Sequence, residues 1–244
     1  MIQDWSMTHC GTVRTLNEDT LVCRRDIGLW AVADGAGGHH AGEVASGMIA
    51  AALDAIPAAL AADEALAQVR LRLAAVHDAL RNRASRDGGV GVVIASTVVV
   101  LLIRDGHFAC LWAGDSRAYL LRRGSLQAVT RDHSLVQELV DAGSLTDQEA
   151  ERHPQANVIT RAVGAGDVVP DLDKTIGPLE PGDRFLLCSD GLCKTLDLAT
   201  LARLTADPSD PAAQLVGTAL EAGVRDNVTA VVVETGDGLP AEPP

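Results

Sequence analysis

The order of the strand-like and helix-like segments limits the fold of this chain more than any other feature. A hairpin over 20–34, with residues 25–28 as its turn, precedes two helices, the first over 42–56 and the second with apolar residues three and four apart between Leu66 and Leu80. The remaining expected elements are strands over 96–103, 107–113, 117–122, 171–176, 184–189 and 228–234, and helices over 197–206 and 210–222. Strands and helices come in runs and do not alternate, which predicts an antiparallel α+β fold with two sheets, each covered by a helix pair.

Several of the expected strands end or begin at an aspartate. The apolar run 29–33 ends in Asp34, which glycines follow, and the pattern recurs around Asp115, Asp190 and Asp226. Taken singly, each aspartate could be a turn former or a helix cap. Together, such carboxylates would repel one another unless cations lay between them, so the pattern predicts a metal cluster. Carboxylate oxygens suit Mg²⁺ or Mn²⁺, and the sequence lacks the closely spaced histidines or cysteines that zinc prefers.

Composition excludes several other classes of protein. The formal net charge of −13 argues against binding along a nucleic-acid backbone. No apolar run is long enough to span a membrane, and the first residues lack the pattern of a signal peptide. The five cysteines show no metal-binding spacing and are expected to be free thiols, so we expect a cytoplasmic protein. One domain over 1–235 and a disordered proline-rich tail over 236–244 are expected.

Six short motifs, in this order and spacing, resemble the metal-dependent serine/threonine phosphatases of the PP2C type, and the resemblance runs from about residue 8 to 234. They are RTLNED at 14–19, ADGAGGH at 33–39, AST at 95–97, AGDSR at 113–117, CSDGL at 188–192 and RDNVT at 225–229. The resemblance implies an α-β-β-α sandwich and hydrolysis of phosphoserine and phosphothreonine on proteins by a metal-activated water. It also implies two Mn²⁺ or Mg²⁺ ions, and substrates that are those of a partner serine/threonine kinase.

The resemblance also implies roles for particular residues. Asp34 would bridge the two ions, the Gly35 carbonyl and Glu18 or Asp19 would serve one ion, and Arg14 would clamp the substrate phosphate. Asp190 and Asp226 would complete the shell of the other ion. Asn227 would support the site beside Asp226 or position a water.

Two positions depart from the family pattern. Many relatives have a histidine proposed as general acid after the Asp-Gly pair, where this chain has Ala36; His39 and His40 lie nearby in the sequence. Relatives often have an acid for a third metal where this chain has Lys194, although Asp115 with Asp190 could still hold a weak third ion.

Two further expectations concern the surroundings of the site. The polar stretch 132–165, called the flap below, is expected to be an insertion that gates the site or an ordinary surface segment. Residues 27–34 are also similar to phosphatases encoded beside type VI secretion systems.

The alternative to an enzyme is a phosphatase-like module that binds phosphorylated or signalling partners without hydrolysing them. Arg14, Asp34, Asp190 and Asp226 are all retained, which favours the enzyme.

Overall fold

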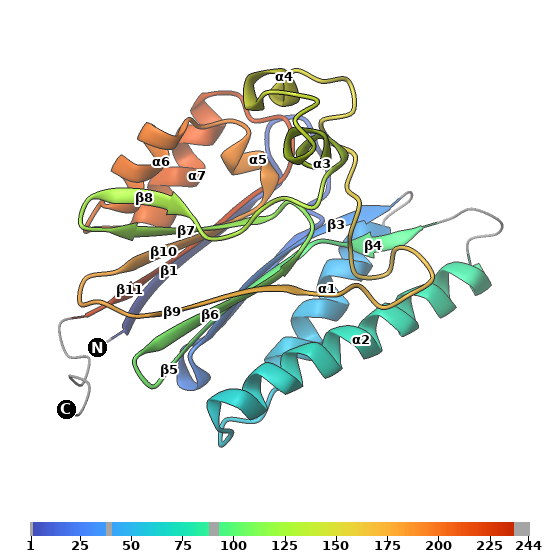
Figure 1. Cartoon of the computed structure of the whole chain (residues 1–244), viewed down its shortest axis with the longest axis horizontal. Helices are drawn as coiled ribbons and strands as arrows, with labels where there is room; N and C mark the ends of the chain where they lie inside the picture. Colours follow the sequence, from blue (N-terminus) through green and yellow to red (C-terminus); the bar gives the residue numbers. More distant parts are fainter. Residues whose placement is uncertain (1, 38–40, 88–92, 237–244) are drawn as a thin grey trace.

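Two antiparallel sheets packed face to face form the centre of the computed structural model, which describes residues 2–37, 41–87 and 93–236 (Figure 1). Sheet A has the strand order β1 (Ile2–His9), β11 (Val228–Thr235), β10 (Arg184–Cys188), β7 (Arg117–Arg122) and β8 (Ser125–Ala128). Sheet B has the order β2 (Asp19–Arg24), β3 (Leu29–Gly37), β5 (Val98–Arg104), β6 (His107–Ala113) and β9 (Asp173–Pro178), and β4 (Ile94–Ser96) pairs with the end of β3.

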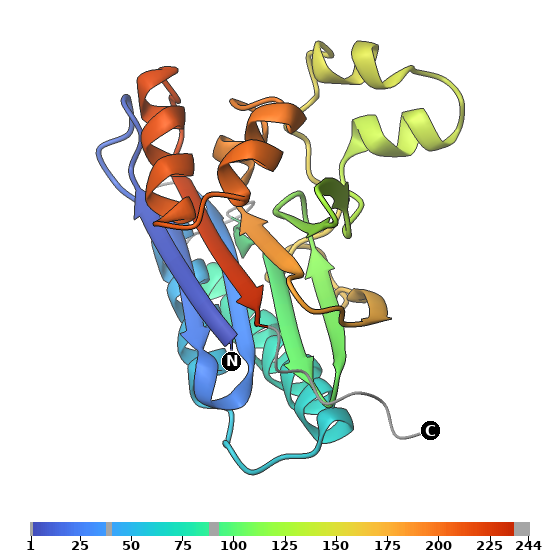
Figure 2. The ribbon, with the colours of Figure 1, turned by 90° about the vertical axis from the view of Figure 1, so that its left-hand side faces the viewer.

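A helix pair covers the outer face of each sheet (Figures 1 and 2). α1 (Ala41–Asp54) and α2 (Ala62–Asp87) pack on sheet B, whereas α6 (Leu198–Thr205) and α7 (Pro211–Glu221) pack on sheet A. A separate apolar layer fills the space between the sheets, where the rings of Phe108 and Phe185 lie 4.9 Å apart. Residues on alternate sides of one strand therefore belong to different layers, as a period of two requires. The predicted α-β-β-α arrangement is confirmed.

Most of the predicted elements are present with small shifts at their ends. The first hairpin turns through the short 3-10 helix η1 (Arg25–Ile27) and Gly28, whose φ of 59° is a left-handed conformation that glycine adopts without strain. In the flap the chain forms two short helices, α3 (Leu135–Asp141) and α4 (Asp147–Glu151), which lie beyond the ends of the strands.

The elements that were not predicted include β1, β8 and the one-turn helix α5 (Asp190–Cys193). β1 pairs with β11 along its whole length but lies at the edge of sheet A, where most of its side chains stay partly or fully exposed. It therefore shows no apolar alternation in the sequence. The expected disorder of 236–244 falls almost wholly on residues outside those described, as do His39 and His40.

The fold brings the predicted acidic residues to one end of both sheets. Asp19 begins β2 and stands directly opposite Asp34 on β3. Asp115 lies in the turn between β6 and β7, Asp190 follows β10, and Asp226 precedes β11. Among the helices in the described ranges, none is long and apolar enough to cross a membrane.

Candidate functional site

Asp34 is the centre of the acidic cluster. Burial raises the pKa of its carboxyl well above the usual range, and the charges of Asp19, Asp190, Asp115 and Asp226 raise it further. Four other aspartates from four separate parts of the chain therefore lie within electrostatic reach of this one group. The convergence predicted from the strand ends is present in the structure.

Hydroxyl groups hold the backbone on which Asp34 is mounted. Ser96 Oγ donates to the Asp34 carbonyl at 2.9 Å, and the Asp34 amide donates to Thr97 Oγ1 at 3.2 Å. Thr97 Oγ1 in turn lies 2.6 Å from Ser116 Oγ. All three hydroxyl residues are buried, so the end of β3 is fixed from both sides.

Asp19 ties sheet B to sheet A. Its side chain is buried, and its Oδ2 accepts hydrogen bonds of 2.7 Å from Ser189 Oγ and from Thr229 Oγ1. Burial raises the pKa of Asp19 to about 7, although the two hydroxyls favour the charged form. Its other oxygen, Oδ1, has no hydrogen-bond partner, so it is available to a cation.

Lys194 lies between Asp115 and Asp190. Its Nζ donates to Asp190 Oδ2 at 2.7 Å and to Asp115 Oδ2 at 3.1 Å. Burial disfavours the ammonium, but the charges of Asp190 and Asp115 outweigh burial and raise the pKa of Lys194. Asp115 is almost fully buried, and burial raises its pKa while the charge of Lys194 opposes the rise.

Arg14, the predicted phosphate clamp, contacts a predicted metal ligand. Its Nη2 lies 2.9 Å from Asp226 Oδ2, and both side chains are about half exposed, at 53% and 48%. The hydrogen bond to Asp226 raises the pKa of Arg14, so the guanidinium is charged. The pair is therefore open to solvent, where an incoming anion can meet the guanidinium.

Asn227 supports the loop that carries Arg14. Its Oδ1 accepts from the Glu18 amide at 2.8 Å, and its Nδ2 donates to the carbonyls of Leu16 at 2.8 Å and Cys10 at 3.1 Å. The predicted support of the site beside Asp226 therefore takes the form of holding the 10–18 backbone. With its amide engaged in three bonds, Asn227 has little capacity left to position a water.

Backbone approaches closely at Gly35. A Cβ placed on this residue would lie 2.0 Å from the Gly42 carbonyl oxygen, and one on Gly42 would lie 2.4 Å from Glu18 Oε1. The first turn of α1 therefore rests directly on the end of β3, and it brings the Glu18 carboxylate beside the Gly35 backbone. The sequence carries no signal for the role of Gly42, because a glycine near the start of a helix is common.

The residues fit divalent ions, although they do not form a closed cage. Within the described ranges, no three or more histidine, cysteine, aspartate or glutamate side chains are grouped closely enough to hold an ion by themselves. Mg²⁺ and similar hard ions keep several waters and take only one or two carboxylates each from the protein. A cluster of separated carboxylates with unpartnered buried oxygens on Asp19 and Asp115 matches such a site.

The sequence did not reveal the hydroxyl residues beside the cluster or the contacts of Lys194. Ser116, Ser189 and Thr229 lie in motifs that also contain an aspartate, and this proximity was the available signal. Ser96 and Thr97 lie in a quoted motif that contains no aspartate. Their partners lie far away in the chain, which spacing alone does not reveal.

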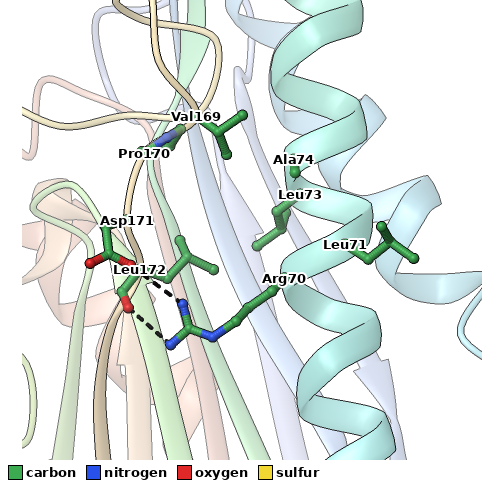
Figure 3. A pocket seen from close by; sticks show the side chains of 8 residues that line it. All are labelled: Arg70, Leu71, Leu73, Ala74, Val169, Pro170, Asp171 and Leu172. Atoms are coloured by element: carbon green, nitrogen blue, oxygen red, sulfur yellow. Dashed lines mark hydrogen bonds and ion pairs between the residues drawn. The ribbon is translucent and has the colours of Figure 1, made fainter.

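A cavity of about 400 Å³ lies elsewhere, between α2 and the segment that leads into β9 (Figure 3). Arg70 crosses it and donates to the Leu172 carbonyl at 3.1 Å. None of the predicted site residues lines this cavity.

Comparison with known proteins agrees with the geometry. The family model for "Protein phosphatase 2C" matches residues 8–221. The serine/threonine protein phosphatase PstP of Mycobacterium tuberculosis is 37% identical over 232 residues, which cover 93% of this chain and 44% of that protein. This chain therefore spans less than half the length of that curated relative.

Two solved structures are similar over almost their whole length. PppA, described as a key regulatory component of T6SS in Pseudomonas aeruginosa, has a TM-score of 0.87 and 44% identity, with 95% of this chain and 96% of that chain covered. The catalytic domain of PstP in complex with two manganese ions has a TM-score of 0.85 and 34% identity, with 97% and 99% covered.

The close approach at Gly35 predicts an intolerance to any side chain there. Gly35→Ala should lower the free energy of unfolding by about 2–3 kcal/mol, because the neighbour that must move is backbone. Gly47→Ala, in the same helix as Gly42 but with open space around it, should raise it by about 0.5–1 kcal/mol through helix propensity. Urea unfolding checks both, and equal effects of the two changes would contradict the packing described here.

The raised pKa of Asp19 predicts a pH dependence of stability in EDTA. Because the folded pKa is about 7 and the unfolded value is near 4, the folded state binds more protons between these values. The contribution of this group to stability is therefore complete below about pH 4 and is lost as the pH rises through about 7. In Asp19→Asn, the free energy of unfolding should fall less steeply with rising pH, as measured by urea midpoints between pH 4 and 8.

The matched control for this effect is Asp26→Asn. Asp26 is exposed, and its hydrogen bond to Arg24 lowers its pKa, so its linkage has the opposite sign. Asp26→Asn should therefore lose stability with rising pH as the wild type does. If Asp19→Asn lost stability just as steeply, the prediction would be contradicted.

Proposed function

This chain belongs to the protein phosphatase 2C family, and we propose that it is a metal-dependent phosphatase that hydrolyses phosphoserine and phosphothreonine on proteins. The observation that carries the proposal is the set of aspartates around Asp34, which converge from both sheets. Burial raises the pKa of three of them, Asp34, Asp19 and Asp115. In the absence of cations, so many carboxylates at one place are destabilising. The same arrangement becomes favourable when divalent ions bind.

Each acidic residue has a distinct position toward two such ions. Asp34, at the centre of the cluster, would contact both ions. As the family resemblance implies, the Gly35 carbonyl and Glu18 or Asp19 would serve one ion, and Asp190 and Asp226 would serve the other. Mn²⁺ and Mg²⁺ are the ions that oxygen ligands of this kind favour. When bound, two such ions supply Lewis-acid activation of a water and neutralise charge on the phosphoryl group.

Arg14 provides the phosphate contact. Its guanidinium is held at the edge of the cluster by Asp226, and both side chains are about half exposed, so a phosphate can reach the guanidinium from solvent. A planar fork of donors binds two phosphate oxygens at once, which orients the phosphorus toward the acidic cluster. Asn227 keeps this loop in place through its bonds to the loop backbone.

The whole described chain contributes to this one site. The acidic residues come from strands, a short helix and loops spread between Glu18 and Asp226, and hydroxyls from both sheets hold two of them. We therefore infer one phosphatase domain over 1–235, with the flap beside its active site. The five cysteines are all free, which supports the reducing cytoplasm as its location.

Hydrolysis of p-nitrophenyl phosphate and of a phosphothreonine peptide tests the proposal. Turnover should appear with Mn²⁺ or Mg²⁺ and vanish in EDTA, and Asp34→Asn should lower kcat by at least about 100-fold, because it removes the group common to both ions. Asp63→Asn, on the exposed first turn of α2, should leave turnover unchanged. Folded protein without turnover under any of these metals would contradict the proposal and favour a binding module.

A narrower proposal concerns the substrate. The 44% identity to PppA, a regulatory component of T6SS, supports a role in reversing threonine phosphorylation by a partner kinase of such a system. Deletion of the gene should then raise phosphothreonine on secretion components, as measured by phosphoproteomics. Unchanged phosphorylation in the deletion strain, with active purified enzyme, would contradict this substrate while leaving the enzymatic activity intact.

A further inference from the structure

Lys194 is one of only two lysines among the 20 lysine and arginine residues of this chain; the other is Lys174. All the other residues in this set are arginines. Its position is also unusual, because the side chain is two-thirds buried and points among the acidic residues. Both facts call for a reason why an ammonium, and not a guanidinium, stands at this point.

The contacts of Lys194 provide that reason. Its Nζ donates to Asp190 Oδ2 at 2.7 Å, to Asn157 Oδ1 at 2.9 Å and to Asp115 Oδ2 at 3.1 Å. An ammonium has three donors on one compact charged atom, so its hydrogen-bonding capacity is fully used by three oxygens around one point. A planar guanidinium spreads its donors over a wider fork and would not fit the same three oxygens. The set is the environment of a small cation.

Charge balance agrees with this interpretation. The proposed site contains six acidic residues, Glu18, Asp19, Asp34, Asp115, Asp190 and Asp226, and two cationic ones, Arg14 and Lys194. With all of them ionised, four negative charges remain, and two divalent ions would balance them. A third divalent ion beside Lys194 would add positive charge at a place where an ammonium already lies within 3.1 Å of both nearby carboxylates.

The third contact reaches the flap. Both ends of the flap are well anchored. Arg117 donates two hydrogen bonds to the Asp132 carboxylate, at 2.8 and 2.7 Å, and Ser96 forms a β-bridge with Val163. Between these ends, over 135–158, side-chain hydrogen bonds in the described structure connect two flap residues to residues outside the flap. Asp141 is joined to Arg131 just before the flap, and Asn157 is joined to Lys194.

We propose that the Lys194 ammonium permanently occupies a third cation position between Asp115 and Asp190. This enzyme therefore binds two metal ions and no third. The same ammonium holds the flap against the site through Asn157. The proposal rests on the two-ion site proposed above. Lys194 is thus a positioning residue, which fixes two acidic side chains and one flap side chain. Unlike a bound metal ion, its ammonium is part of the chain and cannot leave the site.

The first experiment counts bound ions. Equilibrium dialysis against Mn²⁺, followed by elemental analysis, should give two ions per chain for the wild type. Lys194→Asp should give three, because it removes the ammonium and adds a carboxylate beside Asp115 and Asp190. Lys174→Asp makes the same substitution at the exposed lysine on β9 and should leave the count at two.

The second experiment measures the flap in EDTA, where no metal contributes. Asn157→Ala removes the flap contact from the exposed side and leaves the ion pairs of Lys194 intact. Amide hydrogen exchange over 152–158 should become about fivefold faster, the factor that corresponds to the loss of one ordinary hydrogen bond. The ion count of this variant should remain two, which separates the flap contact from the cation position.

The outcomes distinguish this proposal from the proposed function. A wild type that binds no ion would contradict the metal-dependent phosphatase itself. A wild type that binds three ions, or a Lys194→Asp variant that binds no more ions than the wild type, would overturn the third-cation proposal while leaving the two-ion enzyme in place. Unchanged exchange over 152–158 in Asn157→Ala would overturn the flap contact.

Discussion

The mutual repulsion of the carboxylates around Asp34 is the constraint on which the rest of this structure depends. Asp19, Asp34 and Asp115 are drawn into the protein, where burial alone disfavours their charged forms. A fold can hold them there only if other interactions stabilise it. The three apolar layers, one between the sheets and one beneath each helix pair, provide that stabilisation.

Polar contacts at the end of the sheets then fix where each carboxylate points. Hydroxyls from sheet A reach Asp19 on sheet B, and buried hydroxyls hold the Asp34 backbone. Lys194 neutralises part of the charge between Asp115 and Asp190. These contacts leave some carboxylate oxygens without partners, which is the state expected of a site completed by ions and water.

The flap contacts the acidic site through Lys194, the residue that neutralises part of its charge. Its ends are anchored to both sheets, whereas its middle reaches the rest of the molecule through few side chains, among them Asn157. Lys194, which binds Asn157 in this middle part, also lies between Asp115 and Asp190 of the site. The position of the flap and the charge of the cluster are therefore physically connected through the Lys194 ammonium.

The sequence by itself determined the class of fold, because apolar alternation and helical spacing are local: the hairpin with its turn at Gly28, the helix pairs and most strands follow from them. It also determined the acidic residues, since motif order placed Asp34, Asp115, Asp190 and Asp226 at strand ends. It did not reveal β1, whose exposed edge position removes the apolar signal. Only the tertiary structure decided what meets those acids, because the partners of Asp19, Asp226 and Lys194 lie up to 212 residues away along the chain and come together through packing of the two sheets.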